Sequence, residues 1–199
     1  MKFKIRKGLD LPVTGEPEQR VYANPKITRV ALLGREYVGM KPSMRVKEGD
    51  RVKLGETLFT DKKNPRVRYV APGSGVVESI HRGAKRVFQA LIIRLEGDEE
   101  INFSAHDAEQ LLSLSRESVV EQLLQSGLWV AFRTRPYSKS PDPEQLPHSI
   151  FVTATDSRHL AAEPDVIIAD YADDYANGLK LLTRLTTGSV YVCGGEQQA

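Results

Sequence analysis

The first hundred residues alternate short hydrophobic runs with polar turns at close intervals. Gly and Pro separate the runs, a pattern typical of a small β-sandwich or barrel. We predict strands at Lys2–Ile5, Thr28–Leu33, Thr57–Asp61, Val67–Ala71, Gly75–Ile80 and Ala90–Leu95. The pattern therefore predicts an all-β domain over residues 1–103.

The hydrophobic spacing becomes helical after residue 103. Ser104 is a candidate N-cap for a short helix that contains Leu111 and Leu112. A second helix is expected to begin at Ser115 and to stop at Gly127. Its apolar face comprises Val119, Val120, Leu123 and Leu124. We expect residues 104–126 to form a helical connector.

The hydrophobic pattern over residues 127–199 predicts the beginning of an α/β domain. Residues 129–132 are expected to be extended, and three prolines make residues 138–147 a loop. Ile150–Ala154 and Val190–Cys193 have the composition of buried strands. The helix between them is marked by Tyr171, Tyr175, Leu179, Leu182 and Leu185, and closed by Gly188. This βαβ unit supplies only two parallel strands, so we expect an incomplete domain in a truncated chain.

Composition narrows the function classes. The 199 residues carry 28 basic and 26 acidic side chains, a net charge of +2, which gives no global case for nucleic-acid binding. The single cysteine, Cys193, excludes an internal disulfide and any metal site built from four cysteines of this chain. No run approaches the roughly 20 apolar residues of a membrane helix. We expect any membrane contact to be made through partners.

Residues 46–59 and 70–77 resemble the glycine-containing halves of biotinyl/lipoyl carrier modules, which are β barrel-sandwiches. In those modules a lysine at a hairpin tip carries the cofactor. Here the tip is Asn64-Pro65, a good turn dipeptide, and Lys62 and Lys63 lie before it. They are either carrier lysines or solvated side chains on a hairpin arm, and their position favours the second interpretation.

Six longer motifs occur in order along the chain: Ile5–Pro12, Val30–Met40, Asp61–Pro65, His81–Val87, Gly127–Pro136 and Leu181–Cys193. With these motifs the chain resembles, over essentially its whole length, the NqrA family of subunits of the bacterial Na+-translocating NADH:quinone reductase. The resemblance implies a complex that oxidises NADH, reduces ubiquinone and pumps Na+. It implies a peripheral subunit on the cytoplasmic side of the inner membrane, with the flavins and iron–sulfur centre in other subunits.

The resemblance also implies that the second domain is Rossmann-like and related to the flavin-binding subunit of respiratory complex I. Those relatives have a glycine-rich loop after a Gly-Leu pair, where backbone amides approach the FMN phosphate. Here Gly127-Leu128 is followed by bulky residues, including Trp129 and Phe132. Because such side chains block close backbone approach, we expect no FMN at this loop, and NADH binding beside it loses its rationale.

One basic-aromatic run is the best candidate binding segment. It comprises Trp129, Phe132, Arg133, Arg135, Tyr137 and Lys139. A quinone offers two carbonyl acceptors and a flat ring, which Arg or Tyr donors and an aromatic side chain can hold. Because the resemblance implies quinone binding, we expect the quinone at this run, with Leu33, Tyr37 and Met40 as a second wall. Alternatively, Trp129 and Phe132 are core residues, and the arginines cap the loop or bind acidic residues of a neighbouring subunit.

A second basic segment is a turn that contains His81, Arg82, Lys85 and Arg86. We expect it to contact a partner subunit, with a phosphate or an anionic lipid as the alternative. The histidines His106, His148 and His159 lack metal-ligand spacing, so no metal site is expected. No nucleophile arrangement or phosphate loop occurs, and we name no catalytic residue.

Three hypotheses remain. The first is a cofactor-free subunit of the reductase that contributes to ubiquinone binding. The second is a stand-alone lipoyl/biotinyl-type carrier or binding module. The third is a flavin-binding electron-transfer subunit of an Rnf-like complex.

Overall fold

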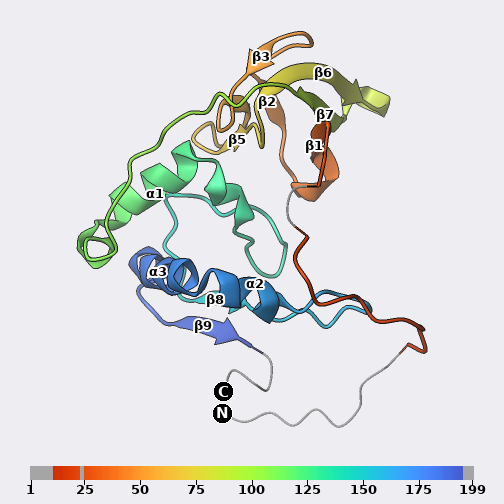
Figure 1. Ribbon diagram of the computed structural model, residues 1–199. Coiled ribbons are helices and arrows are strands. Elements are labelled where there is room, and N and C mark those ends of the chain that lie inside the picture. The colour runs from red at the N-terminus through yellow and green to blue at the C-terminus, as the bar shows by residue number, and fades with distance from the viewer. Residues whose placement is uncertain (1–10, 23–24, 195–199) are drawn as a thin grey trace.

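The computed structural model describes residues 11–22 and 25–194. The predicted strand Lys2–Ile5 lies outside these residues. A β region occupies one end of the molecule and an α/β region the other, with helix α1 (Arg116–Gln125) between them (Figure 1). The expected mixed fold, a barrel-sandwich followed by an α/β domain, is confirmed.

The β region consists of two antiparallel sheets. The first has the order β1 (Arg29–Leu33), β7 (Phe88–Leu95), β6 (Gly75–Arg82) and β3 (Arg51–Val52). The second has the order β2 (Pro42–Met44), β4 (Thr57–Asp61) and β5 (Arg68–Val70). The five predicted strands within the described residues are confirmed. The sequence did not reveal β2 and β3, because two or three residues are too few to show an alternation.

Aromatic side chains join the two sheets. Phe59 of the second sheet stacks on Tyr69, with ring centroids 4.6 Å apart, and meets Phe88 of the first sheet edge to face at 5.2 Å. Leu91 and Ile93 on β7 are fully buried in the same core. Such aromatic pairs stabilise the core beyond the area that they bury.

Helix α1 begins as predicted. The Ser115 hydroxyl accepts a hydrogen bond of 3.1 Å from the Ser118 amide and so caps the helix. Val119, Val120 and Leu124 are buried in the same cluster as the β core. Therefore the connector packs on the barrel-sandwich as part of its core.

Two local predictions near α1 are wrong. No helix begins at Ser104; the only helical turn between β7 and α1 in the described residues is η3 (Leu111–Ser113), which buries Leu111 and leaves Leu112 exposed. The polar residues 104–110 offer no apolar face to pack. Residues 129–132 are not extended either, because Leu128–Ala131 form the 3-10 helix η4. This turn lets Trp129 fold back into the core.

The α/β region contains the predicted βαβ unit. Strands β8 (Ile150–Thr153) and β9 (Val190–Cys193) pair in parallel. Between them lie α2 (Pro164–Asp170), α3 (Ala172–Leu182) and the 3-10 helix η5 (Thr183–Leu185). In Figure 1 the helices lie on one side of the pair.

The two parallel strands are not buried, contrary to the prediction. Phe151 is 66% exposed and stacks on Tyr191 at 5.0 Å, and Cys193 is exposed as well. Among the described residues nothing covers this face, so hydrophobic composition misled the burial prediction. Gly188 allows close approach of the strands' entry segments, since a Cβ there would lie 2.0 Å from the carbonyl oxygen of His148.

Candidate functional site

The predicted binding segment begins in η4 and continues in the loop over residues 132–147. Trp129 is only 4% exposed, and its indole N–H donates a hydrogen bond of 3.0 Å to the carbonyl oxygen of Pro141. Its ring meets half-buried Phe132 edge to face, with centroids 5.3 Å apart. Trp129 is therefore a core residue that packs under the loop. Neither its ring face nor its indole N–H is available to a ligand.

Arg133 connects this loop to the segment predicted as the second wall. Its guanidinium donates to the carbonyl oxygens of Val130 and Phe132, the latter at 2.9 Å, and to that of Glu36 at 3.4 Å. Glu36 belongs to the 3-10 helix η1 (Gly34–Glu36), which directly follows β1. Since three carbonyl oxygens occupy Arg133, its main role is to hold the two segments together.

Tyr37 lies directly after η1 and is half-buried against the core. Its ring meets Tyr69 edge to face at 4.7 Å. Burial raises the pKa of the Tyr37 phenol, an effect that the charge of Arg133 opposes and that of Glu36 reinforces. Burial also raises the pKa of Tyr69 to about 12, with Asp61 adding to the rise and a hydrogen bond with Ser140 opposing it. Both phenols therefore stay protonated near neutral pH and can donate.

The outer part of the loop is exposed. The Lys139 ammonium lies 5.7 Å from the ring centroid of Tyr137, whose side chain is 72% exposed. The loop closes on itself through the Thr134 amide, which donates to the Lys139 carbonyl oxygen at 2.8 Å. A Cβ at Gly39 would lie 3.7 Å from Cε of Lys139, so this side chain reaches the segment over residues 33–40. Arg135 is exposed in the same loop.

The structure thus brings the two predicted walls together, through Arg133 at one point and Lys139 at another. Leu33 ends β1, and Met40 packs on the core, with its amide bonded to the Tyr37 carbonyl oxygen at 3.1 Å. On the outer side of the surface that they form, Arg135, Tyr137 and Lys139 are exposed. Two shallow hollows in the described residues lie elsewhere, one of about 550 Å³ between the second sheet and residues 101–103, and one of about 390 Å³ at residues 169–174.

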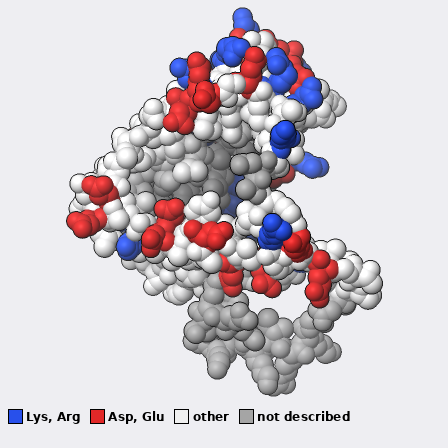
Figure 2. Space-filling model, in the orientation of Figure 1, with Lys and Arg blue, Asp and Glu red and all other residues white. Residues whose placement is uncertain are grey.

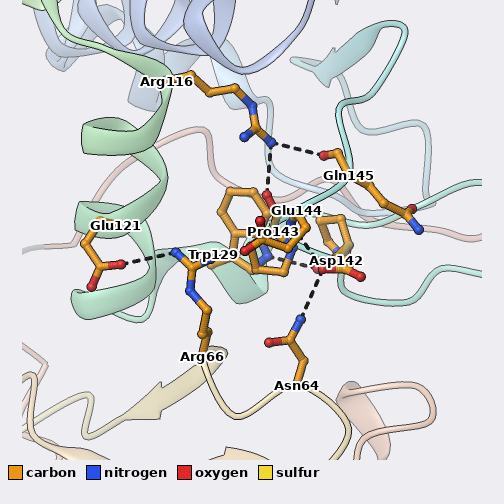
Figure 3. A network of polar contacts seen from close by, with 10 residues as sticks. Asn64, Arg66, Arg116, Glu121, Trp129, Asp142, Pro143, Glu144 and Gln145 are labelled. Atoms are coloured by element: carbon orange, nitrogen blue, oxygen red, sulfur yellow. Dashed lines mark hydrogen bonds and ion pairs between the residues drawn. The ribbon is translucent and has the colours of Figure 1, made fainter.

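The tip of the β4–β5 hairpin, where a carrier module holds its lysine, is docked on the rest of the chain (Figure 3). Asn64 donates to a carboxylate oxygen of Asp142 at 3.3 Å. Arg66 forms ion pairs with Glu121 of α1, at 3.3 Å, and with Glu144. We call this set of contacts the tip network.

Arg116 extends the tip network from the other side, and Figure 3 shows its guanidinium pointing at the same loop. It donates to the carbonyl oxygens of Pro143 at 3.0 Å and Gln145 at 3.1 Å. Lys63 is held as well, because its ammonium donates to the Gly39 carbonyl oxygen at 2.8 Å, while Lys62 is exposed. No local sequence pattern revealed the tip network, since its partners stand up to 78 residues apart.

The segment at Gly127, predicted to bind no FMN, packs against the second sheet. Gly127 has φ +74°, and a Cβ there would lie 2.6 Å from a methyl group of Val70 on the second sheet. The glycine therefore allows the connector to pack against the sheet. Trp129, two residues further along, is buried in the hydrophobic core.

The predicted basic turn lies between β6 and β7. His81 shares a hydrogen bond of 3.0 Å with the Ser79 hydroxyl, and Arg82 ends β6. Lys85 and Arg86 lie in the 3-10 helix η2 (Ala84–Arg86) and are exposed. At the β end of the molecule Lys and Arg side chains alternate with acidic ones, whereas acidic side chains dominate over α2 and α3 (Figure 2).

Metal clusters and membrane-spanning helices are both absent from the described ranges. Over residues 11–22 and 25–194, no three His, Cys, Asp or Glu side chains come together in a way that could hold a metal ion. In the same ranges no helix combines the length and the hydropathy needed to cross a bilayer.

Comparison with known families covers both halves of the chain. Residues 3–96 match the family described as the NqrA N-terminal barrel-sandwich hybrid domain. Residues 114–199 match the NqrA second alpha/beta domain. The two matches follow one another in the same order as the β and α/β regions of the structure.

Several curated relatives are named as a subunit of the Na(+)-translocating NADH-quinone reductase. The one from Cellvibrio japonicus (strain Ueda107) is 58% identical over 194 residues, which is 98% of this chain and 43% of that protein. The one from Pseudomonas aeruginosa (strain UCBPP-PA14) is 56% identical over 98% of this chain and 43% of its own length. The one from Neisseria meningitidis serogroup B (strain ATCC BAA-335 / MC58) is 55% identical over 96% and 43%. The chain spans less than half the length of these relatives.

Proposed function

The chain belongs to the NqrA family, whose members are subunits of the Na(+)-translocating NADH-quinone reductase, and from that premise we propose that it acts as part of this oxidoreductase complex. In this proposal the complex oxidises NADH, reduces ubiquinone and moves Na+. The chain is a peripheral component on the cytoplasmic side of the bacterial inner membrane, and it meets the membrane only through partner subunits. The flavins and the iron–sulfur centre belong to those partners, and the chain itself carries no cofactor.

The observation that carries the cofactor-free role is the tip network. A carrier lysine must swing between active sites, so its hairpin has to project freely. Here Asn64 and Arg66 tie the hairpin to α1 and to the loop over residues 141–145. The loop behind Gly127 likewise holds Trp129 where a flavin-binding relative needs open backbone. Both positions therefore serve packing in this chain.

We further propose that ubiquinone contacts the surface between the two walls. Arg135, Tyr137 and Lys139 are exposed and supply donors for the quinone carbonyls. Tyr37 and Met40 offer an adaptable apolar side, while Arg133 and Trp129 hold the walls in place. Because these donors are exposed, a partner subunit would have to cover the quinone from the other side.

The domain boundaries belong to the same proposal. We assign residues 1–103 to the barrel-sandwich, 104–126 to the helical connector and 127–199 to the Rossmann-like α/β domain. In the assembly the basic turn at His81, Arg82, Lys85 and Arg86 contacts a partner subunit.

Photoaffinity labelling of the assembled complex with a photoreactive ubiquinone analogue tests the quinone proposal. We expect labelled peptides from residues 33–40 or 132–139, protection by excess ubiquinone, and weaker labelling in Arg135→Ala/Lys139→Ala. Lys53→Ala is the matched control, because Lys53 is exposed and lies next to β3, away from both walls. Labels confined to other subunits would remove this assignment and leave family membership untouched.

Flavin content distinguishes the proposed cofactor-free subunit from the alternative of a flavin-binding electron-transfer subunit. The subunit released from the complex is expected to show no absorbance in the flavin bands after denaturation and extraction. A flavin released in stoichiometric amount would instead support a flavin-binding electron-transfer subunit.

A further inference from the structure

The β6–β7 turn and η1 form one basic end of the first sheet. Leu33, the last residue of β1, pairs with Ala90, and His81 pairs with the same residue from the other side. Gly34 of η1 lies so close to β7 that a Cβ there would be 2.2 Å from the carbonyl oxygen of Phe88. Arg35 therefore stands at the same end as the turn. We define the basic end as Arg35, Arg82, Lys85, Arg86 and Val87.

The basic end lacks the charge compensation found elsewhere on this sheet. Arg29 is bound by Glu78 through two hydrogen bonds, and Arg51 and Arg94 both pair with Glu96. In contrast, no carboxylate in the described ranges lies within ion-pair distance of the four cations of the basic end.

Glu48 and Glu36 stand near the basic end, and neither carboxylate forms an ion pair with its cations. Glu48 accepts a hydrogen bond of 2.7 Å from the Ile80 amide, which fixes it beside the strand. Glu36 lies next to Arg35 in η1, where its carbonyl oxygen receives the Arg133 guanidinium from the other wall. The four cations thus stand at one end of the sheet without an ion pair in the described ranges, an arrangement that favours a complementary negative surface.

The turn holds its cations in an unusual backbone conformation. Lys85 has φ +53° and Arg86 φ +60°, the left-handed region that residues with a Cβ rarely adopt. The Gly83 amide closes the turn by donating to the Val87 carbonyl oxygen at 2.8 Å. Val87 is 62% exposed beside the charges. Val87 thus offers one exposed apolar side chain beside the charges, which a partner that binds the cations can cover.

We propose that the basic end is a docking surface for an acidic surface patch on a partner subunit, with an apolar pocket that receives Val87. This rests on the proposed function, since it takes the partner from the same complex. Association steered by such a patch is expected to weaken as salt concentration rises.

The test uses the full-length subunit expressed with the other subunits of the complex. Lys85→Glu/Arg86→Glu is expected to lower the amount of co-purified partner subunits by roughly tenfold or more, because like charges then face each other across the interface. Lys85→Asn/Arg86→Asn should have a smaller effect, because asparagine tolerates the left-handed turn and removes the charges without reversing them. Raising the salt concentration should weaken wild-type assembly and change the double asparagine variant less.

Lys47→Glu/Lys53→Glu is the matched control. It reverses two exposed lysines beside β3, which pairs with the opposite end of β6, and should leave assembly unchanged. Melting temperatures within a few degrees of wild type establish that the variants fold. Unchanged assembly of the reversed variant overturns the inference while the proposed function stands. Failure of the wild-type subunit to assemble overturns the proposed function itself.

A membrane partner predicts a different outcome. If the isolated wild-type protein binds vesicles of anionic phospholipid, and Lys85→Glu/Arg86→Glu abolishes that binding while assembly persists, the surface is a lipid contact and the inference is wrong. The inference predicts no such charge-dependent binding to vesicles.

Discussion

Substitution of Gly127 tests how the C-terminal end of the helical connector packs on the barrel-sandwich. Its φ of +74° would strain an alanine by about 1–2 kcal/mol. The new methyl group would also lie 2.6 Å and 2.9 Å from the two γ methyl groups of Val70, and such over-packing costs about 1–3 kcal/mol. The lower entropy of the unfolded alanine chain offsets roughly 0.5–1 kcal/mol. Gly127→Ala should therefore destabilise the fold by about 2–4 kcal/mol.

Urea and thermal unfolding of the 199-residue chain, followed by circular dichroism, measure this effect. For a chain of this size the loss corresponds to a melting temperature lower by roughly 5–15 °C. Gly178→Ala is the matched control: Gly178 lies inside α3 with no other group within 4 Å of a built Cβ. The same substitution there should stabilise the helix by up to about 1 kcal/mol.

A double-mutant cycle identifies the contact. Val70→Ala removes both γ methyl groups, so it should cancel part of the damage in a Gly127→Ala background. The expected coupling between the two substitutions is about 1–2 kcal/mol. A change in unfolding free energy below about 0.5 kcal/mol for Gly127→Ala, or strictly additive effects in the cycle, would refute the packing of the connector on the second sheet.

Four further perturbations follow from individual contacts. The pKa of Tyr69 is raised to about 12, so the stability due to its neutral phenol is complete below about pH 10 and is lost as pH rises through 12. In Tyr69→Phe the unfolding free energy should lose this dependence on pH between about 10 and 12. A pH profile identical to that of the wild type would contradict the raised pKa. Ser115→Ala removes the cap of α1 and should cost about 1 kcal/mol in urea unfolding, whereas Ser115→Asp should cost little. Gly188→Ala would place a methyl group 2.0 Å from a carbonyl oxygen and should lower the melting temperature by at least several degrees; a wild-type value would argue against the close approach of the strand entries. Arg66→Ala breaks the ion pairs of a half-exposed side chain and should change the free energy of unfolding by at most about 1 kcal/mol. A decrease well above about 1 kcal/mol would mean that these ion pairs are shielded from solvent.

Short-range signals accounted for most of the β region and for the start of α1. Gly and Pro punctuate strands wherever the chain turns, and a serine before an apolar helical face marks an N-cap, so both are readable over a few residues. The wrong prediction for residues 129–132 has a different cause, which is tertiary packing. Residues 128–132 are apolar enough for a strand or a helical turn, and burial of Trp129 decided between them.

Contacts between distant segments were not readable. Asn64 and Asp142 are 78 residues apart, and no local sequence pattern in either segment predicts their hydrogen bond. The exposed face of Phe151 and Tyr191 was mistaken for a buried one, because composition reports what a strand can bury and not what covers it. The two walls around Arg133 and Tyr37 were named from a family resemblance, and their role in quinone binding stays a prediction.

Two scaffolds typical of cofactor proteins serve, in our proposal, to build and anchor a complex. Intact-mass spectrometry of the full-length subunit, released from the purified complex and compared with its polypeptide mass, tests this claim most directly. We predict the unmodified mass, with no lipoyl or biotinyl group on Lys62 or Lys63. A stoichiometric adduct mapped to either lysine would contradict the account, because it would require the docked hairpin to be a working carrier arm.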